Sequence, residues 1–171
     1  REFEAAGVAA MIFEDQESPK KCPAAANKIE ILEIQESIGK IRAAVEARKN
    51  PDVLIIARTD ATTEDEAIER GKAYAEAGAD LIQPISKCFK DIDGLRRYRE
   101  AVGKPLSLQI LGWLESDFSP EEIEEVAGVA VFPLVALFTA TAALRANLAT
   151  LAVTRSAKQL PNAMVDMSDF K

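Results

Sequence analysis

The chain has 171 residues, of which 48% are apolar, and a net charge of −7. This length and apolar share suit a single domain over residues 1–171, and the absence of a basic cluster argues against a nucleic-acid partner. No apolar run approaches the roughly 18 residues of a membrane span, and two cysteines define no disulfide framework, so a cytoplasmic protein with no membrane partner is expected. The chain has no histidine, which excludes histidine-based zinc sites and histidine as a general base.

The first apolar run, Val8–Phe13, predicts a buried strand, and the loop after it is the most informative part of the chain. Two carboxylates stand where the strand ends, and two lysines and a thiol follow within one loop. Active sites of strand–helix barrels are built at the carboxyl ends of their strands, so this loop is a candidate site. The alternative is a solvated, charged loop with one cysteine. The residues concerned are Glu14, Asp15, Lys20, Lys21 and Cys22.

Short apolar runs then alternate with longer amphipathic ones. The further strands expected are Val53–Ala57, Leu81–Pro84, Leu106–Ile110 and Val129–Phe132. The helices expected are Ile29–Arg48, Thr63–Ala77, Asp91–Ala101, one that begins at Ser119-Pro120, and the apolar Ala136–Leu151. Isoleucines at helical spacing predict the helix Ile29–Arg48, and Thr63 and Ser119 are N-cap residues of two others. The apolar helix Ala136–Leu151 is expected to pack on two sides.

The alternation predicts an α/β fold with a parallel sheet. Strand starts recur about every 25 residues, the length of a strand–helix unit, and the apolar strands are typical of a sheet buried on both faces. The alternatives are a barrel or an open doubly wound sheet. No glycine fingerprint of a dinucleotide site follows the first strand, which argues against the Rossmann type of doubly wound sheet. Because a closed barrel needs about 250 residues, we expect a partial (β/α)8 TIM-type barrel that lacks its first three strands.

The order and spacing of several short motifs resemble the isocitrate lyase/phosphoenolpyruvate mutase superfamily. They are Glu14-Asp15-Gln16, Pro19-Lys20-Lys21-Cys22, Lys40-Ile41-Arg42-Ala43-Ala44, Ala57-Arg58-Thr59-Asp60-Ala61, Glu69-Arg70, Ala73-Tyr74, Glu76-Ala77-Gly78-Ala79-Asp80 and Phe132-Pro133. The resemblance implies a (β/α) barrel whose last helix exchanges between the subunits of a homodimer or homotetramer, with Ala136–Leu151 as the candidate helix. It also implies Mg²⁺ as cofactor and a small-molecule carboxylate, a 2-oxo or 2-hydroxy acid, as substrate.

The same resemblance assigns roles to the charged residues at the strand ends. Glu14 would bind Mg²⁺ through a water and Asp15 would support that site, while the principal Mg²⁺ ligand of the superfamily lies in a motif outside this chain. Arg58 would grip the substrate carboxylate with its planar fork, the alternative being an ion pair with Asp60 or Glu14.

The loop thiol and the neighbouring strand ends complete the implied site. Cys22 would act as the acid that protonates the departing carbanion, with Lys20 and Lys21 favouring its thiolate; the alternative is a spare loop thiol. Gln109 stands where many members have an asparagine at a strand end and would bind substrate. The other cysteine, Cys88, is expected to serve in packing.

Some positions depart from the superfamily pattern. Pro23-Ala24 follows Cys22, where the lyases carry Gly-His, and Ile85 stands at a strand end that usually carries a glutamate. Polar contacts to a tricarboxylate are therefore missing or altered, which favours a smaller substrate such as oxaloacetate or a substituted malate.

The implied activity is that of a Mg²⁺-dependent carbon–carbon bond lyase, which acts on a small 2-hydroxy or 2-oxo di- or tricarboxylic acid through a pyruvate enolate. A divalent cation would stabilise the charge that develops on the enolate oxygen. Three alternatives stay open. The first is an oxaloacetate decarboxylase or hydrolase, in which Cys22 is dispensable. The second is a phosphonate mutase or hydrolase, and the presence of Cys22 argues against it. The third is a divergent barrel without catalysis.

Overall fold

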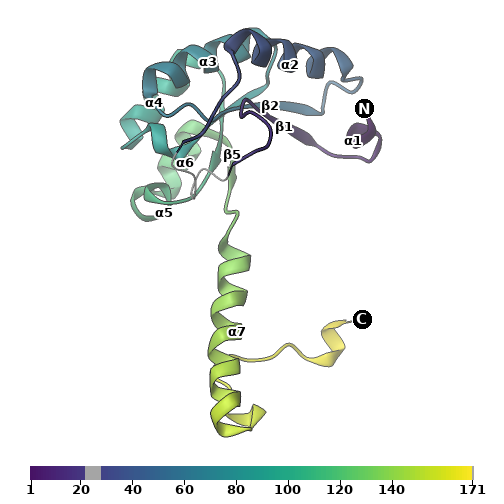
Figure 1. Cartoon of the computed structure of the whole chain (residues 1–171), viewed down its shortest axis with the longest axis vertical. Helices are drawn as coiled ribbons and strands as arrows, with labels where there is room; N and C mark the ends of the chain where they lie inside the picture. Colours follow the sequence, from purple (N-terminus) through teal and green to yellow (C-terminus); the bar gives the residue numbers. More distant parts are fainter. Residues whose placement is uncertain (22–27, 171) are drawn as a thin grey trace. The chain divides into compact units, whose positions relative to one another are not determined.

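The computed structural model describes residues 1–21 and 28–170 of the chain (Figure 1). It divides into two compact units, Arg1–Val131 and Phe132–Lys171, and each is described by itself. Cys22 lies outside the described residues.

The first unit is built on a parallel sheet of five strands in the order β1-β2-β3-β4-β5. The strands are β1 (Ala10–Glu14), β2 (Leu54–Thr59), β3 (Leu81–Pro84), β4 (Leu106–Gln109) and β5 (Ala127–Val131). Every neighbouring pair is parallel, so the carboxyl ends of all five strands lie along one edge of the sheet. The predicted α/β class and parallel sheet are confirmed.

Helices and short turns connect the strands. They are α1 (Glu2–Ala5), α2 (Ile34–Ala47), α3 (Glu64–Glu76), the 3-10 turn η1 (Ser86–Cys88), α4 (Ile92–Val102), α5 (Trp113–Asp117) and α6 (Pro120–Val126). The cap residues act as predicted: the Thr63 hydroxyl accepts from the backbone N–H of Glu66, and Ser119 and Glu122 form a capping box. The predicted start of α2 at Ile29 is wrong, because Ile31 pairs with Gln16 in an antiparallel bridge before the helix begins.

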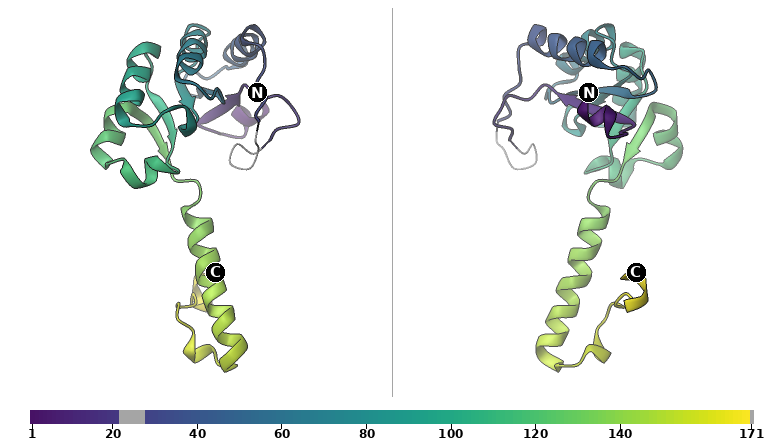
Figure 2. Two further views of the ribbon diagram at one scale, coloured as in Figure 1. Left: turned by 60° about the vertical axis from the view of Figure 1, so that its left-hand side comes forward. Right: turned by 90° about the vertical axis from the view of Figure 1, so that its right-hand side faces the viewer.

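The two faces of the sheet have different surroundings. Helices α2, α3 and α4 run along one face (Figures 1 and 2), and the buried apolar cluster takes Ala57, Ile82, Leu106 and Leu108 from the strands on that side. Because successive side chains of a strand point to opposite faces, the residues next to them point away from these helices. We call this second side the inner face; it carries Glu14, Arg58, Gln83, Ser107 and Gln109.

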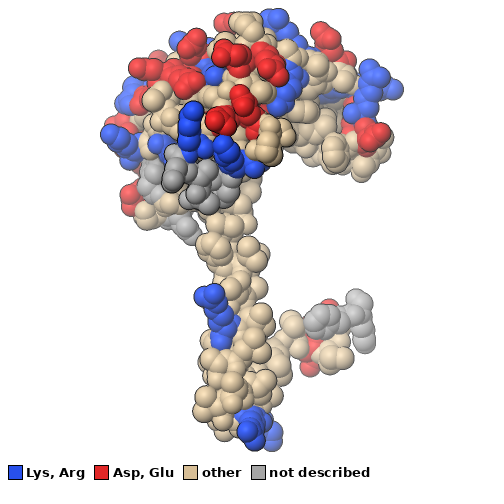
Figure 3. All heavy atoms as spheres, in the orientation of Figure 1, with Lys and Arg blue, Asp and Glu red and all other residues tan. Residues whose placement is uncertain are grey.

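The second unit contains the long helix α7 (Val135–Thr154) and two 3-10 turns, η2 (Ala157–Gln159) and η3 (Met167–Phe170). Asn147 ties the helix to the segment after it, because its Oδ1 accepts from the backbone N–H of Asn162 at 3.0 Å. The predicted helix is confirmed. The expected packing of α7 on two sides is not seen in this single chain, since no α7 residue is buried. Few charged groups lie on the surface of this helix (Figure 3).

Helix α7 is also long and apolar enough to cross a membrane, with a mean hydropathy of 1.4 over its most apolar window. The expectation that no apolar run approaches that length is therefore wrong. One such helix, judged by length and composition, is weak evidence for a membrane span.

Candidate active site

Strand register places four polar residues side by side across the inner face. Glu14 on β1 pairs with Arg58 on β2, and Arg58 pairs with Gln83 on β3. The pairing of Ile82 with Leu106 then sets Gln83 beside Ser107 on β4. We call Glu14, Arg58, Gln83 and Ser107 the polar row. Its first three members are the last or next-to-last residues of their strands, at the edge where parallel sheets bind ligands.

Arg58 lies between two carboxylates and is largely buried, with 12% of its side chain exposed. One guanidinium nitrogen lies 2.7 Å from Oδ1 of Asp60, and the other lies 3.5 Å from Oε2 of Glu14. The ion pairs considered as the alternative for Arg58 are therefore both present. The Nε atom is buried and has no hydrogen-bond partner among the described residues, so it is a donor that suits an incoming carboxylate.

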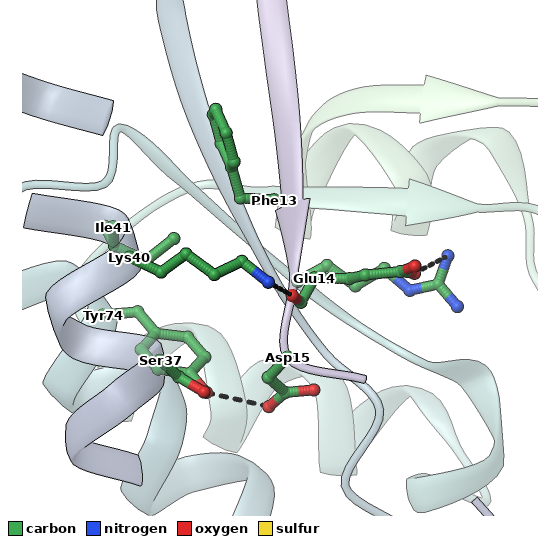
Figure 4. Close-up of a pocket in the computed structure, with 8 residues that line it drawn as sticks. Phe13, Glu14, Asp15, Ser37, Lys40, Ile41 and Tyr74 are labelled. Atoms are coloured by element: carbon green, nitrogen blue, oxygen red, sulfur yellow. Dashed lines mark hydrogen bonds and ion pairs between the residues drawn. The ribbon is translucent and has the colours of Figure 1, made fainter. Parts of the chain in front are cut away.

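Glu14 is held by cations from two other segments. The ammonium of Lys20, in the loop after β1, lies 2.9 Å from Oε2 of Glu14. Lys40 reaches from α2 to the end of β1 and donates to the carbonyl oxygen of Glu14 at 2.6 Å (Figure 4). The Glu14 carboxylate is partly exposed and has a defined position at the edge of the sheet.

Lys21 lies apart from Glu14. Its ammonium pairs with Glu30 at 3.0 Å and lowers the pKa of that carboxylate, and its backbone N–H donates to Gln16. The roles of Cys22, Lys20 and Lys21 as an acid and its activating cations stay predictions.

Asp15 is enclosed by three donors and is 2% exposed. Its Oδ1 accepts from the backbone N–H of Asp60 at 2.8 Å, and its Oδ2 accepts from the Tyr74 hydroxyl at 2.8 Å and from Arg70 at 3.3 Å. Figure 4 shows the Asp15 carboxylate turned toward Tyr74. Burial raises the pKa of the Tyr74 hydroxyl to about 12. Asp15 therefore joins the ends of β1 and β2 to α3.

The carboxylates at this edge suit a hard cation in chemistry, since Mg²⁺ prefers oxygen ligands. Both oxygens of Asp15 are engaged by protein donors, which leaves Glu14 as the more accessible carboxylate. Within residues 1–21 and 28–170, no group of three or more Asp, Glu or Cys residues is placed to hold a metal. The described residues therefore fit a water-mediated contact of Glu14 with Mg²⁺ and do not make a whole ligand set.

Gln83 and Ser107 are candidate site residues that the sequence alone did not indicate. They are 2% and 1% exposed, and the Ser107 hydroxyl donates to Oε1 of Gln83 at 3.0 Å. The available signal was a polar residue inside each of two apolar runs. Gln109, predicted to bind substrate, lies two residues beyond Ser107 on the same strand and is half-buried.

Two residues that follow β3, Ile85 and Cys88, lie in the buried apolar cluster. Ile85 is 9% exposed and extends the buried cluster beyond the strand. Cys88 is buried, its thiol donates to the Ile85 carbonyl at 3.0 Å, and burial raises the pKa of the thiol to about 12. The expected packing role of Cys88 is confirmed.

Comparison with known proteins identifies the family of the chain. Residues 1–155 match the phosphoenolpyruvate phosphomutase family. The chain is 40% identical to the 2,3-dimethylmalate lyase of Eubacterium barkeri over 149 residues, which cover 84% of this chain and 50% of that protein. It is 36% identical to the 2-methylisocitrate lyase of Shewanella oneidensis strain MR-1 over 139 residues, which cover 78% of this chain and 47% of that protein.

A solved structure shows the same fold. Phosphonopyruvate hydrolase in complex with oxalate and Mg²⁺ superposes with a TM-score of 0.81 and 28% identity, and the match covers 98% of this chain and 59% of that one. The chain spans about half the length of the curated relatives it matches. From the family match and these identities, the chain belongs to the phosphoenolpyruvate phosphomutase family, within the isocitrate lyase/phosphoenolpyruvate mutase superfamily.

Proposed function

We propose that the full-length protein is a Mg²⁺-dependent carbon–carbon bond lyase that acts on a small 2-hydroxy or 2-oxo di- or tricarboxylic acid. The observation that carries the proposal is Arg58, a buried guanidinium fixed between Glu14 and Asp60 whose Nε lacks a partner among the described residues. The two relatives above are named as lyases of substituted malate-type acids, which supports the same class.

In this proposal, Arg58 binds the substrate carboxylate next to the hydroxyl-bearing carbon, C2. The bond between C2 and C3 breaks as the C2 hydroxyl passes its proton to a water molecule acting as the base, and the hydroxyl oxygen becomes the carbonyl oxygen of pyruvate. The electron pair of the broken bond passes to C3, which takes a proton from an acid, the role proposed for Cys22. Mg²⁺, when bound, would stabilise the negative charge that develops on oxygen, with Glu14 as its water-mediated partner.

The proposal also concerns parts beyond the five-stranded sheet. Further strands would complete an eight-stranded barrel and bring the principal Mg²⁺ ligand to the carboxyl edge. The exposed apolar surface of α7 supports its exchange between the subunits of a homodimer or homotetramer, because such a surface is stabilised when it is covered. A cytoplasmic location belongs to the same proposal.

The test is pyruvate release by the full-length protein with Mg²⁺, from 2-methylisocitrate, 2,3-dimethylmalate and oxaloacetate. We expect Arg58→Ala to lower kcat/KM by about 100-fold or more, because a charged contact to the substrate is lost. Arg97→Ala is the matched control, since Arg97 forms an exposed ion pair with Glu64 away from the polar row, and it should leave turnover unchanged. Unchanged turnover in both Arg58→Ala and Cys22→Ser would overturn the proposal.

Oxaloacetate decarboxylation is the second candidate, favoured by the buried apolar Ile85 directly after β3. A small dicarboxylate needs no polar partner at that position. The Cys22→Ser variant separates the two candidates, because decarboxylation would continue without the thiol and cleavage of a substituted malate would not.

A further inference from the structure

Two members of the polar row, Gln83 and Ser107, form a buried pair that the proposed reaction does not yet use. Both side chains are almost fully enclosed, and the Ser107 hydroxyl donates to Oε1 of Gln83 at 3.0 Å. A buried amide is unfavourable unless its polar atoms find partners, so Ser107 stabilises Gln83 in a strand that is otherwise apolar.

The Ser107 contact also determines which end of the amide can serve a ligand. Because Oε1 accepts from Ser107, the end that Gln83 can offer is the Nε2 group, a donor of two N–H bonds. Gln83 is the register neighbour of Arg58 on the same face of the sheet. The two side chains therefore start about 4.8 Å apart, the spacing of neighbouring strands.

This spacing matches the size of a malate-type substrate. When its C1 carboxylate binds Arg58, the substituent on C3 lies a few bonds farther along, at about one strand spacing. An N–H donor at that position favours an oxygen acceptor and disfavours an alkyl group, since burying the donor against a methyl would leave it unpaired.

We propose that Gln83 is a specificity-determining residue, and that its amide donates to a carboxylate carried by the C3 substituent of the substrate. Ser107 is the positioning residue that orients this amide. The inference rests on the proposed lyase function and names its substrate class. The protein would prefer 2-methylmalate-type acids that carry a carboxylate on the C3 substituent over analogues that carry an alkyl group there. Gln83 also supplies a polar contact of the kind that is missing at Ile85.

Two substrates test this preference. 2-Methylisocitrate carries a carboxymethyl group at C3 and 2,3-dimethylmalate carries a methyl group, and cleavage of either releases pyruvate. We expect the full-length protein to prefer 2-methylisocitrate. Gln83→Leu should lower kcat/KM for 2-methylisocitrate by about 10- to 100-fold, mostly through a higher KM. The kcat/KM for 2,3-dimethylmalate should stay within about threefold of the wild-type value, because only 2-methylisocitrate loses a charged hydrogen bond.

Two further variants keep the test decisive if Gln83→Leu fails to fold by circular dichroism. Gln83→Glu retains the shape and places a negative charge beside the substrate carboxylate, so its loss should be at least as large as that of Gln83→Leu. Ser107→Ala removes the positioning contact and should shift the ratio of the two substrates in the same direction by a smaller factor. A wild-type preference for 2,3-dimethylmalate, or an equal loss on both substrates in these variants, would overturn the inference.

Arg58→Ala separates this inference from the proposed function. If it abolishes turnover of both substrates while the Gln83 variants leave their ratio unchanged, the lyase assignment holds and the role of Gln83 is wrong. If Arg58→Ala leaves both activities intact, the proposed function itself fails, and the role of Gln83 fails with it.

Discussion

The Arg70 guanidinium lies 3.3 Å from Oδ2 of Asp15 in the interior of the first unit, although the two residues are 55 positions apart in the sequence. The same arginine donates to the Leu32 carbonyl at 3.0 Å and to Glu66 at 3.1 Å. One side chain on α3 thus holds the end of β1 and the segment that precedes α2, which are the parts that position Glu14.

Removing the Asp15 charge should destabilise the protein strongly. Asp15→Asn keeps the volume and removes the buried carboxylate on which three donors converge, while Arg70 keeps Glu66 as its counter-ion. We expect a loss of about 1–3 kcal/mol in the free energy of unfolding, measured with urea. Asp93→Asn is the control, because Asp93 pairs with Arg96 on the surface, and its midpoint should not move. Equal midpoints for the two variants would contradict the prediction.

Stability should fall at high pH through Tyr74. Burial raises the pKa of its hydroxyl from 10.0 to about 12, so the folded protein holds this proton more tightly than the unfolded chain does. The contribution is full below pH 10 and is lost as the pH rises through 12.

The Tyr74→Phe variant tests this pH dependence. It removes the titrating group, so its free energy of unfolding should fall less steeply above pH 10 than that of the wild type. A remaining slope is expected, because burial also raises the pKa of Tyr98. The two curves, measured by urea unfolding at several pH values, would coincide if Tyr74 did not contribute.

The contact between α3 and α4 depends on Gly71. A Cβ atom at this position would lie 2.6 Å from the Tyr98 hydroxyl oxygen and 2.7 Å from a methyl group of Val102. Gly71→Ala should therefore destabilise the protein by about 1–3 kcal/mol. Gly39→Ala in α2 meets no atom within 4 Å and should instead stabilise it by about 0.5–1 kcal/mol, because alanine suits a helix better. Similar shifts for both variants in urea unfolding would show that the packing at Gly71 is looser than described.

Much of this fold follows from patterns within single segments. Apolar runs located the strands to within a few residues, and the caps at Thr63 and Ser119 located two helix starts. The start of α2 could not be predicted in this way, because Ile31 continues the helical spacing but pairs with Gln16, a contact between separate segments.

The site was predictable where one residue carries the signal. Glu14 and Arg58 stand at strand ends, and their charges mark them. Gln83 and Ser107 can be recognised as neighbours of Arg58 only when β3 and β4 are aligned with β2, and this requires the register of the sheet. Because Glu14 and Asp15 are adjacent in the sequence, the pattern predicts one metal site for both. The Glu14 carboxylate contacts Lys20 and Arg58. The Asp15 carboxylate instead contacts Tyr74 and Arg70.

Lysine should not replace arginine in the polar row. The planar fork of Arg58 contacts Asp60 and Glu14 through separate nitrogens and leaves Nε for a ligand, whereas an ammonium has one nitrogen. For Arg58→Lys we expect KM for 2-methylisocitrate to rise by about tenfold or more and kcat to fall less, because orientation of the carboxylate is lost while the positive charge stays. Arg97→Lys, which alters an exposed pair with Glu64, should leave both constants unchanged. A KM for Arg58→Lys equal to that of the wild type would show that charge alone, without the fork, holds the substrate carboxylate.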